Sequence, residues 1–243
     1  MSEPFLSIVI PAYNEALRIP SSLAAIERYV ESKGFPVEIL VVDDGSTDDT
    51  RGVAARYPGV RVVSNGRNRG KGFSVRHGAL EARGEFVLFT DADLSAPIEE
   101  CDKLLAAIQS ASADAAVGSR ALQRELIGVR QSRFREWGGR FFNLLVRLAT
   151  GLPIHDTQCG FKLFRRGATR RAFELQRVEG FGFDPEILFL IHRLGGELIE
   201  VPVRWNHSAD TKVHYLRDST RMTLDLVVLR WRAFTGQYPK DGS

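Results

Sequence analysis

Short apolar runs alternate with longer amphipathic segments along the first half of the chain. The runs that predict strands are residues 6–13, 37–46, 60–65, 85–93 and 114–120. The segments with helical periodicity, several of them bounded by glycine or proline, are residues 15–33, 47–58, 70–84 and 97–111. Pro11 is expected to stop the first strand. Strands buried on both faces and separated by helices are typical of βαβ units, so the pattern predicts a Rossmann-like α/β fold with a mostly parallel central sheet, flanked by helices, in a single domain.

Polar loops follow the first four predicted strands. They read PAYNE, DDGS, NRGKG and DAD in chain order. In an open α/β sheet the ligand binds at the carboxyl ends of the strands, so these four loops are expected to meet at one edge. The glycine-rich dinucleotide fingerprint is missing after the first strand, which argues against NAD as a ligand.

The DAD loop is the strongest chemical signal of the four. Asp91 and Asp93 would point to opposite faces of an ideal strand, so the chain must turn there for both to serve one site. Hard divalent cations such as Mg²⁺ or Mn²⁺ are held by one or two carboxylates together with substrate phosphates. A metal bridging a pyrophosphate would make it a better leaving group. The alternative is a plain strand-end turn that caps the helix after Pro97.

The second and third loops are more ambiguous. Asp43 and Asp44 can hold a base or ribose, or can simply form a turn and a helix cap at Gly45 and Ser46. Lys71 in the NRGKG stretch can bind a nucleotide phosphate near a helix N-terminus, although the Walker spacing is missing and a solvated loop is equally compatible.

Composition adds a local excess of positive charge to this picture. The net charge is only +3, but seven arginines and two acids lie between Arg120 and Arg147. Such a patch indicates phosphates or a lipid surface as partners, or else a solvated helix face. The two cysteines, Cys101 and Cys159, form no motif and fit a reducing compartment. No signal peptide or transmembrane segment is evident.

Six stretches taken together resemble family 2 glycosyltransferases of the GT-A fold. They are LSIVIPAYNE, VVDDGSTDDT, NRGKG, FTDADLS, DTQCGFKLF and GFGFDPEILFL, and the match runs from about Leu6 to Lys212. The first four are common to the whole family, whereas the last two are much more specific to a subgroup that the chain resembles, the dolichyl-phosphate β-glucosyltransferases and their bacterial polyprenyl-phosphate relatives. We therefore expect a GT-A domain over residues 1–212, and an amphipathic helix and tail over 213–243 that either belongs to it or associates with a membrane.

The resemblance implies a role for each matching residue. The expected donor-nucleotide residues are Pro11, Ala12, Tyr13, Glu15, Asp43, Asp44, Lys71, Asp91, Ala92 and Lys212. Asp93 is the expected direct metal ligand, with Asp91 as the weaker one. Asp156 and Lys162 match the segment that lines the sugar and acceptor site, and Asp184 and Glu186 match an acidic pair on the acceptor side. The expected catalytic residues are Asp93, Asp156 and Asp184.

Two basic, aromatic-rich segments are candidates for membrane contact, because members of the resembled group carry membrane anchors. Residues 133–152 interleave arginines with aromatic residues, and residues 216–234 place Leu224, Val227, Val228, Trp231 and Phe234 on one helical stripe flanked by arginines. The alternative for each is an ordinary amphipathic helix packed on the sheet. The acceptor phosphate is expected to bind Arg133, Arg135 or Arg140, together with Lys162.

The expected reaction moves glucose from UDP-glucose to a polyprenyl monophosphate with inversion, using Mg²⁺ or Mn²⁺, at the cytoplasmic face of a membrane. The expected partners are the sugar nucleotide, the lipid phosphate and the membrane surface, and no nucleic acid. The near alternative is mannosyl transfer from GDP-mannose. A sugar-1-phosphate nucleotidyltransferase would usually carry a glycine-rich loop where PAYNE stands, and a non-catalytic sugar-nucleotide-binding protein would be expected to have lost DAD or DTQCGFKLF.

Overall fold

A seven-stranded sheet forms the centre of the molecule in a computed structural model, which describes residues 3–129, 133–206 and 215–239. The strand order is β3-β2-β1-β4-β7-β5-β8. The strands are β1 (Leu6–Ala12), β2 (Val37–Asp43), β3 (Val60–Ser64), β4 (Phe86–Thr90), β5 (Ala115–Ser119), β7 (Phe161–Arg165) and β8 (Leu198–Pro202). Only β7 runs antiparallel to its neighbours β4 and β5, so the expected mostly parallel sheet is confirmed. A short parallel pair, β6 (Ile127–Val129) with β9 (Trp205–Asn206), lies apart from it.

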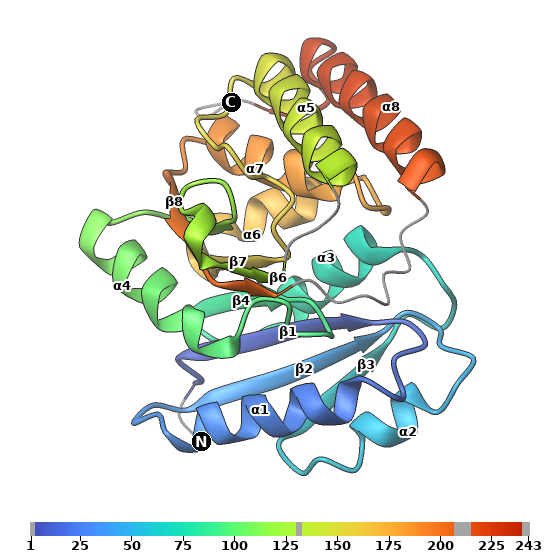
Figure 1. Cartoon of the computed structure of the whole chain (residues 1–243), viewed down its shortest axis with the longest axis vertical. Coiled ribbons are helices and arrows are strands. Elements are labelled where there is room, and N and C mark those ends of the chain that lie inside the picture. Colours follow the sequence, from blue (N-terminus) through green and yellow to red (C-terminus); the bar gives the residue numbers. More distant parts are fainter. Residues whose placement is uncertain (1–2, 130–132, 207–214, 240–243) are drawn as a thin grey trace.

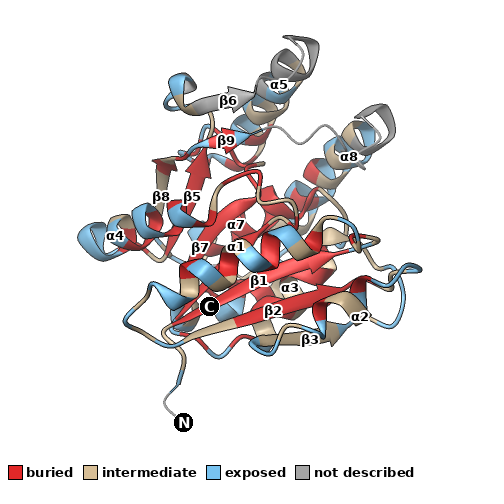
Figure 2. Cartoon of the chain, turned by 60° about the horizontal axis from the view of Figure 1, so that its bottom comes forward, coloured by how far each residue is buried: buried red, intermediate tan, exposed pale blue. Residues whose placement is uncertain are grey.

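Helices cover both faces of this sheet, as Figures 1 and 2 show. One face packs against α1 (Ile19–Glu31), α2 (Thr50–Ala54) and α4 (Cys101–Ala111), and the other against α3 (Lys71–Glu81), α6 (Arg166–Leu175) and α7 (Phe183–Arg193). The two-residue period of the strands divides the core in this way: Ile8 and Ile10 of β1 face the first layer and Val9 faces the second. Burial of both strand faces explains why these strands read as continuous apolar runs.

Two long helices lie against the second layer. They are α5 (Arg133–Thr150) and α8 (Tyr215–Phe234), which contact each other and α7 and lie side by side in Figure 1. Val146 of α5 and Leu226 and Leu229 of α8 are buried in these contacts. No helix in the described part of the chain is long and apolar enough to cross a membrane. The predicted boundary at 212/213 falls at residues 207–214, outside the described ranges, and stays a prediction.

The structure differs from the predicted elements in three places. Pro11 lies inside β1 in register with Val42, because the ladder to β4 ends at Val9 and the missing N–H of Pro11 removes no hydrogen bond there. The predicted helix at 47–58 is reduced to Thr50–Ala54, because Thr47 bonds to Asn14 and Asp48 to the Ala16 N–H, in the segment after β1. The predicted helix at 15–33 begins only at Ile19, after a turn in which Glu15 binds Arg18.

Candidate active site

The loops after β1 and β2 are joined at the carboxyl edge of the sheet. Ala12, at the end of β1, is in register with Asp43, at the end of β2. Asn14, in the left-handed region at φ +54°, accepts a 2.8 Å hydrogen bond from the Thr47 N–H through its side chain. Asp43 accepts a hydrogen bond from the Ser46 N–H at 3.1 Å. The predicted convergence of these loops is therefore present.

Of the PAYNE residues, only the side chain of Tyr13 is largely open to solvent, with 37% of its surface exposed. Pro11 and Ala12 are buried in the strand end. Glu15 is almost fully buried, and its carboxylate binds the Arg18 guanidinium through two hydrogen bonds of 2.7 and 2.8 Å. A ring presented at the edge of the sheet is suited to stacking on a nucleobase.

Asp44 organises the NRGKG loop. Its buried carboxylate accepts hydrogen bonds from the Asn65 amide at 2.7 Å and from the N–H groups of Arg69 and Gly70 at 2.9 and 2.8 Å. Gly70 has a φ of +105°, and a Cβ there would lie 2.4 Å from the Glu179 carbonyl oxygen, so glycine is required. The loop thereby delivers Lys71 to the first turn of α3.

The chain turns at the DAD sequence, as two carboxylates serving one site require. Leu94 adopts a left-handed φ of +46°, and Asp93 accepts a hydrogen bond from the Ser95 N–H at 3.0 Å. The buried Ala92 holds this turn against α1, because its carbonyl accepts the Ser22 hydroxyl at 2.6 Å. Both aspartates remain partly exposed.

Lys71 and Asp91 form an ion pair between two of these loops. The Lys71 Nζ lies 2.6 Å from Asp91 Oδ1, and it also lies 5.3 Å from the centre of the Phe89 ring. Burial acts to lower the pKa of Lys71, but the negative charges of Asp91 and Asp184 raise it above its usual range. Lys71 is therefore a firmly charged cation beside the DAD carboxylate.

A second, fully buried ion pair also lies near Phe89, with the Lys162 Nζ 5.7 Å from the centre of that ring. The Lys162 Nζ of β7 is 2.5 Å from Asp184 Oδ1 of α7 and 2.5 Å from the Cys159 carbonyl oxygen. Burial raises the pKa of Asp184, although Lys162 and Lys71 act against that rise. We call Lys71, Asp91, Lys162 and Asp184 the lysine–aspartate cluster. With no exposed surface, Lys162 is placed to hold Asp184 rather than to reach an acceptor phosphate, so its predicted acceptor role gains no support here.

The DTQCG segment fits directly against Asp91. The Asp91 N–H donates to the Gly160 carbonyl at 3.2 Å, and a Cβ at Gly160 would lie only 1.9 Å from Asp91 Oδ2. DTQCGFKLF, the motif typical of the resembled subgroup, is therefore in contact with DAD, the motif common to the whole family. Burial raises the pKa of the Cys159 thiol to about 12, which favours the neutral thiol over the nucleophilic thiolate near pH 7.

Asp156 is paired with Arg120, at the carboxyl end of β5. It accepts hydrogen bonds from Arg120 Nε at 2.7 Å, Nη2 at 2.8 Å and the backbone N–H at 3.0 Å. The Arg120 guanidinium also lies 4.9 Å from the centre of the Trp205 ring. Burial acts to raise the pKa of Asp156, but the Arg120 guanidinium holds it below its usual range. Asp156 is therefore an ionised, rigidly oriented carboxylate.

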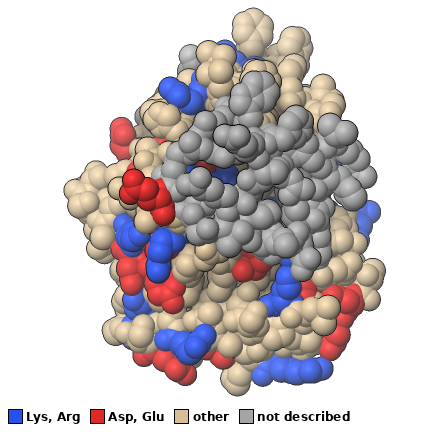
Figure 3. Space-filling model, in the orientation of Figure 1, with Lys and Arg blue, Asp and Glu red and all other residues tan. Residues whose placement is uncertain are grey.

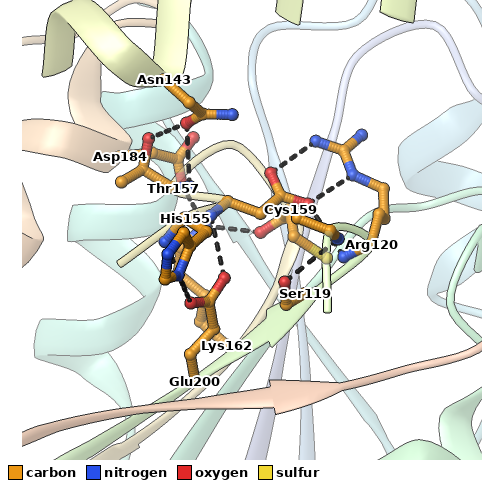
Figure 4. Close-up of polar contacts among 11 residues, drawn as sticks. Ser119, Arg120, Asn143, His155, Thr157, Cys159, Lys162, Asp184 and Glu200 are labelled. Atoms are coloured by element: carbon orange, nitrogen blue, oxygen red, sulfur yellow. Dashed lines mark hydrogen bonds and ion pairs between the residues drawn. The ribbon is translucent and has the colours of Figure 1, made fainter. Parts of the chain in front are cut away.

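Neighbouring polar side chains fix the segment around Asp156. Glu200 of β8 accepts hydrogen bonds from the N–H groups of His155 and Asp156, each at 2.9 Å. Asn143 of α5 accepts the Thr157 hydroxyl at 2.8 Å, as Figure 4 shows. Sequence reasoning missed Asn143 and Glu200, and treated Arg120 only as part of a basic patch. Its position as the last residue of the strand predicted at 114–120 was the available signal.

Several predicted residues are not brought into this arrangement. The backbone positions of Arg133, Arg135 and Arg140 are on α5, but their side chains lie outside the described residues, as does Lys212. Glu186 lies two residues after Asp184 on α7 and is fully buried, but its carboxylate binds Tyr238 instead of the cluster. No group of three or more possible metal-ligating side chains occurs in the described part of the chain.

The fold is shared with solved sugar-transferring enzymes. A structure of glucosyl-3-phosphoglycerate synthase from Mycobacterium tuberculosis in complex with UDP has a TM-score of 0.68 at 22% identity, covering 94% of this chain and 80% of that one. Mannosyl-3-phosphoglycerate synthase from Rubrobacter xylanophilus has a TM-score of 0.71 at 21% identity, covering 98% of this chain and 76% of that one. These likenesses confirm the GT-A architecture.

Sequence comparison gives the family. The profile described as Glycosyl transferase family 2 matches residues 7–173. The dolichyl-phosphate beta-glucosyltransferase of Saccharomyces cerevisiae is 38% identical over 97% of this chain and 77% of its own length, and that of Mus musculus is 37% identical over 96% and 77%. The chain therefore belongs to glycosyl transferase family 2, within the group whose curated members carry the name dolichyl-phosphate beta-glucosyltransferase. The resemblance seen in the motifs is confirmed.

Proposed function

We propose that this protein transfers glucose from UDP-glucose to the phosphate of a polyprenyl monophosphate, inverting the anomeric carbon to give a β-linked lipid sugar. The observation that carries the proposal is the contact between Asp91 of DAD and Gly160 of DTQCG. This contact places the loops expected to bind the donor beside the segment expected to bind the acceptor. The names of the curated relatives support glucose and a polyprenyl phosphate, and the Mycobacterium tuberculosis enzyme was solved with UDP-glucose and Mn²⁺.

The donor would lie along the carboxyl edge of the sheet. Tyr13 would stack on the base, Asp43 would bind the base or ribose, and Lys71 would bind the diphosphate. Asp44 would act on the donor only by shaping the loop that carries Lys71. This arrangement would hold the departing diphosphate and stabilise the charge that develops on it.

Asp91 and Asp93 would hold a divalent metal. Two partly exposed carboxylates one residue apart, at a turn, supply the hard oxygen donors that Mg²⁺ or Mn²⁺ takes together with substrate phosphates, so the residues present fit the ion. The bound ion would offset negative charge on the leaving diphosphate. Asp91 would then exchange its present partner, the Lys71 ammonium, for the metal.

The acceptor needs little activation by the protein. A phosphate monoester is largely dianionic at neutral pH because its second pKa is about 6, so its oxygen can attack without a strong base. Arg133, Arg135 and Arg140 of α5 are the proposed phosphate ligands. Asp184 and Asp156, which Lys162 and Arg120 hold in place, would orient the sugar or serve as an optional base.

We infer that α5 and α8 together contact a membrane surface, on its cytoplasmic side. Val227, Trp231 and Phe234 of α8 are 63, 63 and 86% exposed, and Leu148 of α5 is 76% exposed. We call these residues, with Phe141, Leu144, Leu224 and Val228, the apolar face. Exposed Arg147, Arg221 and Arg230 lie on the same two helices, which suits an anionic lipid surface. In Figure 3 the side chains that are coloured at the top of the molecule are mostly neutral, with a few basic ones.

The proposal is tested by assaying the purified chain with a panel of sugar nucleotides and a short polyprenyl phosphate, with Mn²⁺ or EDTA. The expected result is UDP release from UDP-glucose that requires both the lipid phosphate and the metal, with a β-linked product by NMR. Transfer from GDP-mannose alone would overturn the donor assignment. UDP release that does not depend on the lipid phosphate would overturn the acceptor assignment.

A further inference from the structure

Glu186 is a fully buried carboxylate that takes no part in the lysine–aspartate cluster, although it lies on the first turn of α7 beside Asp184. Its Oε2 accepts hydrogen bonds from the N–H groups of Val178 at 2.7 Å and Arg177 at 3.1 Å. Its Oε1 accepts the hydroxyl of Tyr238, and the Arg232 guanidinium lies 3.7 Å away. A buried carboxylate with this many partners is expected to define the geometry around it.

Tyr238 ties the segment after α8 to both ends of α7. Its side chain is fully buried, with the hydroxyl on Glu186 at the first turn of the helix. At the last turn, Arg193 donates to the carbonyl oxygens of Tyr238, Pro239 and Ala233 at 3.1–3.2 Å. The end of α8 and the residues after it are therefore fixed along the whole length of α7.

The Oε2 atom of Glu186 connects α7 to the loop that carries Lys71. Glu186 holds the backbone at Val178, and this segment packs on the start of α3: the Phe73 N–H donates to the Glu179 carbonyl at 3.1 Å. Gln176 donates to the Gly72 carbonyl at 2.9 Å. A Cβ at Gly72 would lie 2.6 Å from the Val178 carbonyl oxygen, so the two backbones pack too closely to admit a side chain at Gly72. Lys71 lies between the two glycines, Gly70 and Gly72, that contact this segment.

α8 also touches α7 directly beside Asp184. A Cβ at Gly182, the residue that precedes α7, would lie 2.4 Å from Asp225 Oδ2 of α8. The position of α8 therefore bears on the start of α7, which carries Asp184, and through Glu186 on the loop that carries Lys71. Both routes end in the lysine–aspartate cluster.

We propose that Glu186 and Tyr238 form a clamp through which α8 sets the positions of Lys71 and Asp184 at the donor site. They are positioning residues, since neither touches the expected substrates. Because α8 carries part of the apolar face, the clamp is also the connection by which contact of that face with a surface would reach the site. The inference rests on the proposed function only in taking UDP as the probe of the donor site.

The test compares Tyr238→Phe, Glu186→Ala and Glu186→Gln in the full chain. Tyr57→Phe is the matched control, because it also removes a hydroxyl hydrogen bond, to the Pro20 carbonyl at 3.1 Å, on the opposite face of the sheet. Hydrogen–deuterium exchange of the free protein reports on residues 68–75 and 181–188 without any ligand. Calorimetric titration with UDP and Mn²⁺ reports on the donor site, and the melting temperature of each variant reports on overall stability.

We expect exchange about tenfold faster in both regions for Tyr238→Phe, as loss of one hydrogen bond to a charged group implies. UDP affinity is expected to fall by about 2- to 30-fold, the usual range for mutations that act through an intervening network. Glu186→Ala should show both effects and Glu186→Gln smaller ones, because a glutamine oxygen still accepts from Val178 and Arg177, whereas its uncharged NH₂ group can bond to Tyr238 only by donating to the phenol oxygen. Tyr57→Phe should show neither.

The proposal is overturned if only residues 235–239 exchange faster while the two regions and UDP affinity stay unchanged, because Tyr238 would then merely anchor the tail. It is also overturned if Tyr57→Phe weakens UDP binding equally at a similar loss of melting temperature. If the wild-type chain binds no UDP, the donor assignment fails, and the exchange of residues 68–75 and 181–188 still decides on the clamp.

Discussion

The Lys71 ammonium lies 2.6 Å from Oδ1 of Asp91, one of the two carboxylates that we propose as metal ligands. The lysine and the proposed metal would therefore compete for Asp91 and, once the donor binds, would both act on its diphosphate. Such an exchange would let the ammonium stabilise a partly buried carboxylate before the donor binds, without blocking the site.

Lys71→Met should separate these two roles. Removing the ammonium leaves Asp91 free, so the Mn²⁺ concentration needed for half-maximal UDP binding should fall. The diphosphate loses one cationic contact, so kcat should fall by about 10²-fold. Calorimetry with varied Mn²⁺ and steady-state kinetics measure the two effects. Lys103→Met is the control, because Lys103, on α4, pairs with Glu100, just before that helix. A higher Mn²⁺ requirement in Lys71→Met would contradict the competition.

Gly160→Ala should damage the site through Asp91 alone. The added Cβ would lie 1.9 Å from Asp91 Oδ2 and would displace the carboxylate. Misplacement of a catalytic group by about 1 Å costs on the order of 10²-fold in rate. Gly167→Ala is a matched control, because a Cβ there meets nothing within 4 Å, and on helix α6 it should slightly stabilise the protein. Activity is compared at equal folded fraction, and near-normal turnover of Gly160→Ala would show that Asp91 tolerates displacement.

Asp93→Asn should remove the metal-binding charge and leave the turn intact. The asparagine carbonyl can still accept the Ser95 N–H that Asp93 now accepts at 3.0 Å, so the melting temperature should be unchanged. Turnover should fall by about 10²- to 10³-fold, the effect of losing one strong electrostatic contact to the transition state. The check is turnover at saturating Mn²⁺. Near-normal turnover that still requires the metal would exclude Asp93 as the ligand.

The strand ends were predictable because the signal for each lies in adjacent residues. An apolar run followed by polar residues locates a loop, whatever the rest of the chain does. The contact between Asp91 and Gly160 was not predictable, since it arises from the antiparallel strand β7, which brings residues 161–165 beside β4. The partners of the Glu186 carboxylate could not be predicted from the sequence either. The family resemblance implied that it forms one acidic pair with Asp184, but successive positions on a helix point about 100° apart, so the two carboxylates diverge.

The stripe on α8 shows where the sequence pattern is ambiguous in principle. Val227, Trp231 and Phe234 have the spacing of a core-facing stripe, but the residues that pack inward are Leu226 and Leu229. Periodicity alone cannot say which of two apolar faces meets the protein, because both satisfy the same rule. Only the exposure in the folded chain distinguishes them.

Arg120→Met should reverse the pH dependence of stability that Asp156 contributes. In the native chain the pKa of Asp156 is held below its unfolded value near 3.8, so its contribution is present above that pH and is lost as the pH falls through the folded pKa. Without Arg120, burial raises that pKa instead, and the buried charge destabilises the variant increasingly as the pH rises.

At pH 7 the loss in unfolding free energy should be about 3–5 kcal/mol, as for a broken buried pair. Urea unfolding between pH 4 and 7 should show the difference from the wild type shrinking toward acid. For Arg56→Met, which breaks the exposed pair with Asp49, the loss should stay below about 1 kcal/mol. A gap between Arg120→Met and the wild type that does not change with pH would mean that Arg120 stabilises by packing on Trp205 rather than through Asp156.

The apolar face should be recognisable by its effect on lipid binding. Trp231→Ser and Phe234→Ser each remove a large, exposed ring from α8, so the melting temperature should hardly change. Full burial of one such side chain in an apolar phase contributes about 1.5–3 kcal/mol, so each variant should bind anionic vesicles roughly tenfold more weakly or worse. Leu17→Ser is the matched control, because Leu17 is 97% exposed but lies in the loop between β1 and α1, away from both helices.

Vesicle co-sedimentation at fixed salt gives the partition coefficients, with vesicles of neutral lipid as a second reference. Unchanged binding in both ring variants would place the membrane contact elsewhere, and an equal loss for Leu17→Ser would mean that the binding is a general property of exposed apolar side chains.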